Sequence, residues 1–167
     1  MKSITSKLSI IILSLFVSAF TYGQVSEITV AQSNSQAFTA CIAQMSQYSP
    51  PTSMYGGQDV QKMQYNMDGI STIRSCANQY QMTDTESSCG TQISAWNGGP
   101  QAANDNQGPL IQHLFASLNK FRSCSNQYQA SCGAQISAWN GPSNDETAQN
   151  DWVFTEMKKL RSCANQS

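Results

Sequence analysis

The stretch Arg122-Ser-Cys-Ser-Asn-Gln-Tyr-Gln129, followed by Ser131-Cys-Gly-Ala-Gln-Ile-Ser-Ala-Trp-Asn-Gly-Pro142, decides the fold because both of its halves occur elsewhere in the chain. The first half returns as Arg74-Ser-Cys-Ala-Asn-Gln-Tyr-Gln81 and as Arg161-Ser-Cys-Ala-Asn-Gln166. The second half returns as Ser88-Cys-Gly-Thr-Gln-Ile-Ser-Ala-Trp-Asn-Gly-Gly-Pro100. The chain is therefore built from repeated units, each with one cysteine near its start and one near its end.

A more diverged copy of the second half begins at Cys41. In every copy the first cysteine is followed by an apolar residue four positions on and by an aromatic residue seven positions on. These residues are Cys41, Met45 and Tyr48 in the first unit, Cys89, Ile93 and Trp96 in the second, and Cys132, Ile136 and Trp139 in the third. Positions spaced in this way lie on one face of an α-helix, so we expect a helix at the start of each unit.

A second helix is expected before the second cysteine of each unit. Apolar residues stand three, six and nine positions before Cys76, Cys124 and Cys163, a spacing typical of an amphipathic helix. In the order of the units, these residues are Ile73, Phe121 and Leu160, then Ile70, Leu118 and Met157, and then Met67, Phe115 and Phe154. Each unit is therefore predicted to be an antiparallel pair of helices with a cysteine at either end.

The first residues of the chain have the pattern of a secretory signal peptide. Lys2 and Lys7 precede the apolar run 8–20, and small residues stand where a signal peptidase would cut, near Gly23. We expect residues 1–23 to be removed and the protein to be secreted or periplasmic. No later stretch approaches the roughly 18 consecutive apolar residues of a membrane-spanning helix, so no transmembrane segment is expected after cleavage.

Six cysteines in an exported chain are typical of a disulfide framework. An antiparallel helix pair brings its two cysteines to the same level, which favours the pairs Cys41–Cys76, Cys89–Cys124 and Cys132–Cys163. The rival set joins neighbouring units as Cys76–Cys89, Cys124–Cys132 and Cys41–Cys163. A continuous helix from Cys124 to Cys132 would rise about 12 Å, whereas a disulfide spans at most roughly 7 Å between Cα atoms. This favours pairing within each unit.

The sequence predicts an all-α fold. Three tandem disulfide-stapled helical hairpins, at about 37–80, 84–128 and 129–166, would form one small bundle or short solenoid within a single domain over 24–167. If the connectors between units are helical as well, the chain becomes a four-helix up-and-down bundle. Its helices would span about 28–48, 59–96, 110–139 and 144–164. A capping pattern at Thr83-Asp-Thr-Glu86 predicts a break near Thr83.

The charge balance weighs against nucleic acid as a partner. Without residues 1–23 the chain has seven basic and ten acidic residues, a formal charge of about −3. Binding to a phosphate backbone needs many cations. Charged residues make up 11% of the chain, well below the ~25% that is usual, so the surface is expected to be mostly neutral and polar.

The residue types needed for catalysis are few. His113 is the only histidine, and it stands eleven positions before Cys124, where the other units have Tyr65 and Trp152. With all cysteines in disulfides, no histidine and cysteine metal cluster or activated nucleophile can form. The acidic group Asp145, Glu146 and Asp151 lies at the start of a predicted helix, where the helix dipole favours carboxylates. We therefore expect no enzyme, no cofactor and no metal, and an enzyme that uses carboxylates is the third hypothesis.

Two groups of residues are candidates for binding. An aromatic ring beside an amide at a loop edge is a common way to hold a sugar or a peptide, and the chain has this pair twice, at Trp96-Asn97 and Trp139-Asn140. Basic residues recur two positions before each second cysteine, as Arg74, Arg122 and Arg161. The helix dipole explains their place, but together they would also form a basic end for an acidic partner.

The sequence favours an exported, non-enzymatic binding or interaction protein as the function. Its partner would be an unknown protein, a glycan or a small apolar ligand. The alternative is a carrier that holds a small apolar ligand between its helices, lined by methionine and aromatic side chains. An interaction protein would have a filled core and exposed tryptophans, whereas a carrier would have an enclosed apolar cavity.

Overall fold

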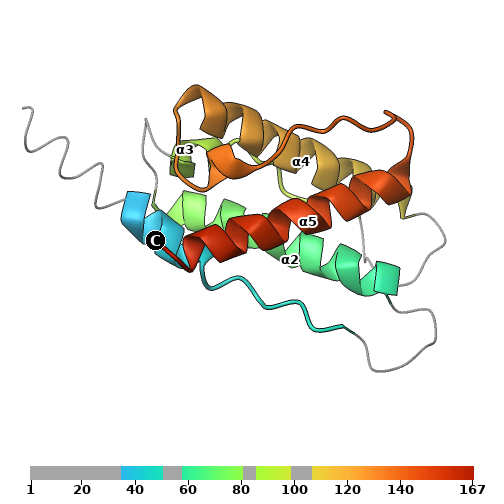
Figure 1. Ribbon diagram of the computed structural model, residues 1–167, viewed down its shortest axis with the longest axis horizontal. Coiled ribbons are helices and arrows are strands. Elements are labelled where there is room, and N and C mark those ends of the chain that lie inside the picture. Colours follow the sequence, from blue (N-terminus) through green and yellow to red (C-terminus); the bar gives the residue numbers. More distant parts are fainter. Residues whose placement is uncertain (1–34, 51–57, 81–85, 99–106) are drawn as a thin grey trace, which may run out of the picture.

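The computed structural model describes residues 35–50, 58–80, 86–98 and 107–167 (Figure 1). These residues form helices and no strands, as the sequence predicts. The elements are a helix over 35–42, α2 (Gln58–Gln79), α3 (Glu86–Gly90), α4 (Gly108–Gln127), the 3₁₀ turn η1 (Gly133–Gln135) and α5 (Glu146–Ala164). The predicted signal peptide, the start of the predicted mature chain and the predicted break near Thr83 lie outside the described residues.

Three long helices, α2, α4 and α5, pack against one another and form the body of the domain. They run in the same direction, so their C-terminal ends lie at one end of the molecule (Figure 1). The residues three and six positions before the second cysteines fill the core between them. Each is at most 2% exposed, and they are Ile70, Ile73, Leu118, Phe121, Met157 and Leu160. The predicted second helix of each unit is therefore confirmed.

The prediction of a full helix at the start of each unit is wrong. α3 ends at Gly90, and the third unit has only the 3₁₀ turn η1. The chain then runs on without helix through Ser94–Asn97 and Ser137–Asn140. The four-helix bundle is also wrong, because α2 ends at Gln79 and α4 at Gln127 rather than continuing into the next unit.

The length of the chain explains why these first segments are extended. Cys132 and Cys163 are 31 residues apart, and α5, which ends one residue past Cys163, takes 18 of them. The whole 19-residue helix is about 28 Å long, and the remaining 13 residues, 133–145, must return over that distance. As a helix they would reach about 20 Å, but as extended chain they reach about 43 Å. A short turn followed by extended chain is therefore the arrangement that fits.

Three disulfides join each short first segment to the end of a long helix. The pairs are those favoured from the sequence, with Cα–Cα distances of 5.8 Å for Cys41–Cys76, 5.4 Å for Cys89–Cys124 and 5.7 Å for Cys132–Cys163. These distances are usual for disulfides. Each closes a loop of just over 30 residues, which stabilises the fold by about 3–4 kcal/mol on the chain-entropy model.

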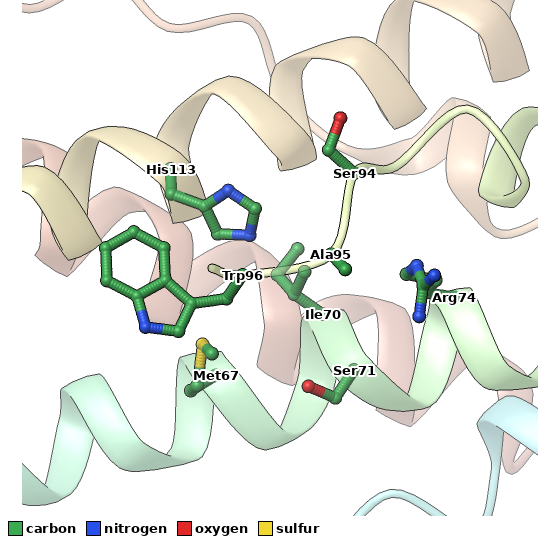
Figure 2. Close-up of a pocket in the computed structure, with 8 residues that line it drawn as sticks. All are labelled: Met67, Ile70, Ser71, Arg74, Ser94, Ala95, Trp96 and His113. Carbon is green, nitrogen blue, oxygen red and sulfur yellow. The ribbon is translucent and has the colours of Figure 1, made fainter. Parts of the chain in front are cut away.

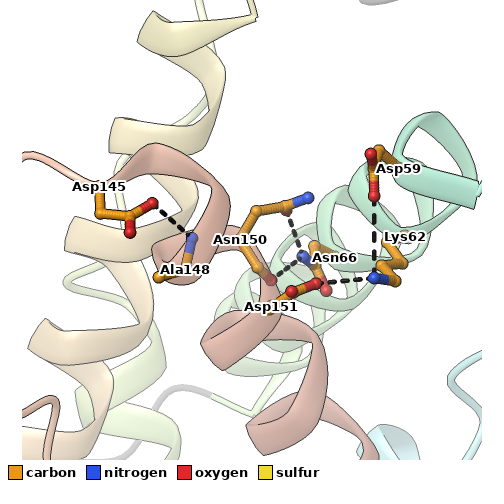
Figure 3. A network of polar contacts seen from close by, with 7 residues as sticks. All are labelled: Asp59, Lys62, Asn66, Asp145, Ala148, Asn150 and Asp151. Atoms are coloured by element: carbon orange, nitrogen blue, oxygen red, sulfur yellow. Dashed lines mark hydrogen bonds and ion pairs between the residues drawn. The ribbon is translucent and has the colours of Figure 1, made fainter. Parts of the chain in front are cut away.

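Polar contacts hold the N-terminal ends of the long helices (Figure 3). The Asp145 side chain accepts a hydrogen bond from the Ala148 N–H and so caps α5. The buried Asn66 amide of α2 donates to the backbone carbonyl and to the side-chain oxygen of Asn150 in α5. Lys62 bridges α2 and α5 through an ion pair of 2.7 Å with Asp151. Within the described ranges, no helix has the length and apolar character to cross a bilayer.

Candidate functional site

Each unit places two ring-bearing side chains in contact, one from the extended segment and one from the long helix. The first ring follows the first cysteine by seven positions, and the second precedes the second cysteine by eleven. The ring centroids are 5.8 Å apart in Tyr48–Tyr65, 5.2 Å in Trp96–His113 and 6.0 Å in Trp139–Trp152. His113 thus occupies the position that a larger aromatic ring takes in the other two units.

In two of the three contacts a third ring is added by the long helix of another unit, from the position nine before its second cysteine. Phe154 lies 4.7 Å from Tyr48 and 5.5 Å from Tyr65, and we call these three residues the tyrosine cluster. Phe115 lies 5.4 Å from both Trp139 and Trp152, forming what we call the tryptophan cluster. Both clusters are filled by edge-to-face rings, an arrangement that aromatic side chains favour.

The corresponding position beside Trp96 and His113 is not filled by a third aromatic ring. Met67 stands there in place of phenylalanine, and His113 is smaller than tyrosine or tryptophan. A pocket of about 240 Å³ opens between α2, α4 and the extended segment that carries Trp96. Figure 2 shows Met67, Ser71 and Arg74 along α2, with Trp96 and His113 near Met67 and Arg74 at the other side of the pocket. We call this hollow the Arg74 pocket.

The three repeated arginines differ in their partners. The Nε of Arg122 donates to the Ile136 carbonyl over 2.9 Å, and the Nε of Arg161 donates to the Met45 carbonyl over the same distance. Both acceptors stand four positions after the first cysteine of another unit. The corresponding acceptor for Arg74 would be the Ile93 carbonyl. Arg74 instead has no hydrogen bond or ion pair with any described residue, and its half-buried side chain lines the pocket.

The charge in the Arg74 pocket comes from its arginine. None of the eight residues that line the pocket is acidic. Burial lowers the pKa of His113, so its imidazole is neutral near pH 7. A second hollow of about 220 Å³ shares Ser94 and His113 with the pocket and reaches Lys120, whose Nζ donates to the Gln92 carbonyl. The neighbourhood is therefore basic.

A comparable hollow beside the tyrosine cluster has the opposite character. It is smaller, about 180 Å³, and is lined by Gln61, Gln64 and Asp68 together with the two tyrosines. Asp68 accepts a hydrogen bond from Gln64, so its carboxylate already has a partner. An arginine without a partner therefore distinguishes the Arg74 pocket from this hollow.

The structure separates the residues that the sequence groups as binding candidates. Trp96 lines the Arg74 pocket, whereas Trp139 belongs to the tryptophan cluster. Asn97 and Asn140 are exposed. A Cβ atom on Gly98 would lie 2.1 Å from the Trp96 indole, and one on Gly141 would lie 2.3 Å from the Trp139 indole. Each Trp-Asn-Gly sequence thus folds its indole over the glycine, which gives the motif a structural role.

The carboxylates near the start of α5 have separate structural contacts. Asp145 caps the helix and Asp151 pairs with Lys62 (Figure 3), while the Glu146 carboxylate lies beside Gly108. Sequence reasoning missed the buried Glu86, which is 1% exposed. Its carboxylate accepts hydrogen bonds from the Gly133 N–H and the Ser131 hydroxyl. Burial raises the pKa of Glu86, and these hydrogen bonds offset part of that effect.

Two features of the sequence indicate the pocket, and only one of them, His113, stood out without the structure. The exchange of a large ring for His113 is visible when the units are aligned, and so is Met67 in place of phenylalanine. Their meaning depends on knowing that both side chains face Trp96. No protein-family model, curated protein or solved structure matches this chain. The geometry of the Arg74 pocket is therefore the main support for a function.

Proposed function

We propose that this chain is an exported, non-enzymatic binding protein and that it binds a small molecule in the Arg74 pocket. One observation carries the proposal. Of three corresponding positions, two are filled by aromatic clusters with a nearby arginine bonded to a carbonyl. The third has a pocket with a half-buried arginine that forms no hydrogen bond or ion pair with the part of the chain that the structure describes. Buried and half-buried charges in folded proteins are usually paired, so a ligand is the natural partner for Arg74.

The proposal includes a repeat architecture. We propose that the three units pack in one order, with the first segment of each held by its own long helix and by the long helix of another unit. α3 contacts α2 and α4, and η1 contacts α4 and α5. The first segment of the chain contacts α5 through Arg161 and Phe154. These contacts support treating the Arg74 pocket as a diverged copy of the two clusters.

Export is also part of the proposal. Three disulfides are compatible with an oxidising compartment. The chain begins with the pattern of a signal peptide, and the two features agree. We therefore propose that the protein works outside the cytoplasm, where its disulfides persist.

The alternative, a carrier with an apolar ligand between its long helices, has less support. The side chains between those helices are buried against one another, and Ile73, Leu118 and Met157 have no exposed surface. A ligand at this place would have to separate helices that are already packed. The Arg74 pocket lies at the side of this core and needs no such change.

The test is a comparison of the wild type with a variant whose pocket is filled. Met67→Phe with His113→Tyr gives the pocket the ring positions of the tyrosine cluster. Both proteins, oxidised and folded by circular dichroism, are incubated with a small-molecule extract and washed, and the bound compounds are released and identified by mass spectrometry. We expect compounds that the wild type retains and the filled variant does not. Equal retention, or none by either protein, would contradict the proposal.

A further inference from the structure

We infer that the Arg74 pocket binds a small organic monoanion, with a carboxylate against Arg74 and a flat apolar part against Trp96. The inference rests on the proposed binding function and adds the chemical class of the ligand. Its support comes from the charge, the hydrogen-bond donors and the shape of the pocket.

The charge of the pocket selects an anion. The Arg122 and Arg161 guanidinium groups each donate to a carbonyl oxygen, which shows the kind of acceptor that this position takes. Arg74 has the same place in its unit and no acceptor among the described residues. A guanidinium group binds a carboxylate through two parallel hydrogen bonds, and these are stronger than bonds between neutral groups. No acidic side chain lines the pocket, so an incoming carboxylate meets no other carboxylate there.

Two serines also line the pocket with hydroxyl groups. Ser71 stands one turn before Arg74 on α2, and Ser94 lies across the pocket on the extended segment (Figure 2). The pocket has one permanent positive charge, because His113 is neutral near pH 7. A single charge suits a monoanion, whereas a phosphate dianion would keep an unbalanced negative charge. A neutral sugar would leave Arg74 without an ionic partner.

The remaining walls are apolar and match a flat group. Met67, Ile70 and Trp96 contribute thioether, aliphatic and indole surfaces. Trp96 lines the pocket with its indole, which also contacts His113 and lies over Gly98. A cavity of roughly 150 Å³ holds benzene, so a pocket of about 240 Å³ has room for one ring and a carboxylate. An aryl or arylalkyl carboxylic acid fits these dimensions.

The test uses phenylacetate as the probe and phenylacetamide as its neutral counterpart. Binding to the oxidised protein over residues 24–167 is followed by the indole NMR signals and by isothermal titration calorimetry. We expect phenylacetate to bind with a dissociation constant of about 1 mM or tighter. Phenylacetamide and inorganic phosphate should each bind at least about tenfold more weakly.

Two variants separate a specific ion pair from general attraction. Arg74→Gln removes the charge in the pocket, and because Arg74 has no hydrogen bond or ion pair with a described residue the variant should fold normally. It should weaken phenylacetate binding by about tenfold or more. Lys158→Gln is the matched control, since the Lys158 ammonium lies over the Phe154 ring of the tyrosine cluster, 4.2 Å from its centroid. This variant should bind phenylacetate as the wild type does.

The outcomes distinguish this inference from the proposed function. If phenylacetate binds the wild type and Arg74→Gln equally, or if the amide binds as well as the acid, the ion pair with Arg74 is refuted. If no carboxylate binds but the extract yields a ligand that the filled variant rejects, the anion class is refuted and the binding site stands. If neither experiment gives a ligand, both proposals fail.

Discussion

Replacing each of the three repeated arginines with alanine should destabilise two of the variants far more than the third. Arg122 and Arg161 both donate to backbone carbonyls in the first segment of another unit, and Arg74 does not. Each arginine lies in a long helix and is followed by Ser-Cys, so the change in helix propensity is the same in each variant. The difference in stability among the variants therefore measures the contact between units.

The expected magnitude follows from the geometry. A hydrogen bond from a charged donor contributes about 1.5–3 kcal/mol, and an acceptor left unsatisfied costs a similar amount. Ile136 and Met45, whose carbonyls would lose their donor, are each 3% exposed, so water replaces the arginine poorly. We expect Arg122→Ala and Arg161→Ala to lose about 2–3 kcal/mol of unfolding free energy. Arg74→Ala should lose less than about 0.5 kcal/mol.

The assay is urea unfolding of the oxidised proteins, followed by circular dichroism and by tryptophan fluorescence. For a domain of this size, a loss of 2 kcal/mol corresponds to a fall in Tm of roughly 8 °C, so calorimetry gives an independent value. Equal destabilisation by all three substitutions would refute the reasoning, because it would mean that the carbonyl contacts contribute nothing beyond the arginine side chain itself.

Three further predictions concern the buried carboxylate, the tryptophan turns and the disulfides. Burial raises the pKa of Glu86 above its ordinary value of 4.5, so its contribution to stability is present below about pH 4.5 and is lost as the pH rises through the folded-state pKa. Glu86→Gln should therefore reduce the fall in Tm between pH 4 and pH 7. An unchanged fall in Tm would contradict this role. Gly141→Ala should lower the free energy of unfolding by about 1–3 kcal/mol because the Trp139 indole is held in a filled cluster. Gly98→Ala should lower it less because Trp96 borders a pocket. Thermal unfolding of the two variants measures the difference, and equal losses would contradict it. Replacing Cys132 and Cys163 together by serine should cost about 3–4 kcal/mol in urea unfolding, and a loss below 1 kcal/mol would show that the bridge does not constrain the unfolded chain.

The long helices could be predicted from the sequence because their apolar positions repeat with a helical period before each second cysteine. Ile73, Phe121 and Leu160 are at most 1% exposed, as that spacing requires. The disulfides followed from the same alignment of units. These features are local, and a periodic pattern over 20 residues rarely fits another structure.

The first segments were predicted wrongly because a spacing of four and seven residues also fits a turn followed by extended chain. Ile93 and Ile136 are buried as the helical pattern predicts, although neither is in an α-helix. The short distance in sequence from Cys132 to the cap at Asp145 contained the answer, since a helix of that length cannot return along α5. This limit on length applies only because α4 and α5 run in the same direction (Figure 1), so that the chain after Cys132 must return to the start of α5.

The binding site could be predicted only in part. His113 stood out in the alignment because the other units have larger rings at its position. Arg74 could not be singled out from Arg122 and Arg161, because the same Ser-Cys sequence follows all three arginines and an apolar residue precedes each of them. What separates them is the presence or absence of a carbonyl acceptor from another unit, and no local pattern encodes it.

Arg161 and Phe154 of the last unit contact Met45 and Tyr48 of the first unit, and this contact bears on how the number of units can change during evolution. An open solenoid grows or shrinks by whole repeats, because its end repeats have a free face to receive another. In the packing order proposed above, the last unit contacts the first, so a fourth copy would have no free edge to pack against and a deletion would leave two edges without a partner. On that arrangement the number of units would stay at three, and new functions would come from substitutions at one contact between units while the other two contacts hold the structure.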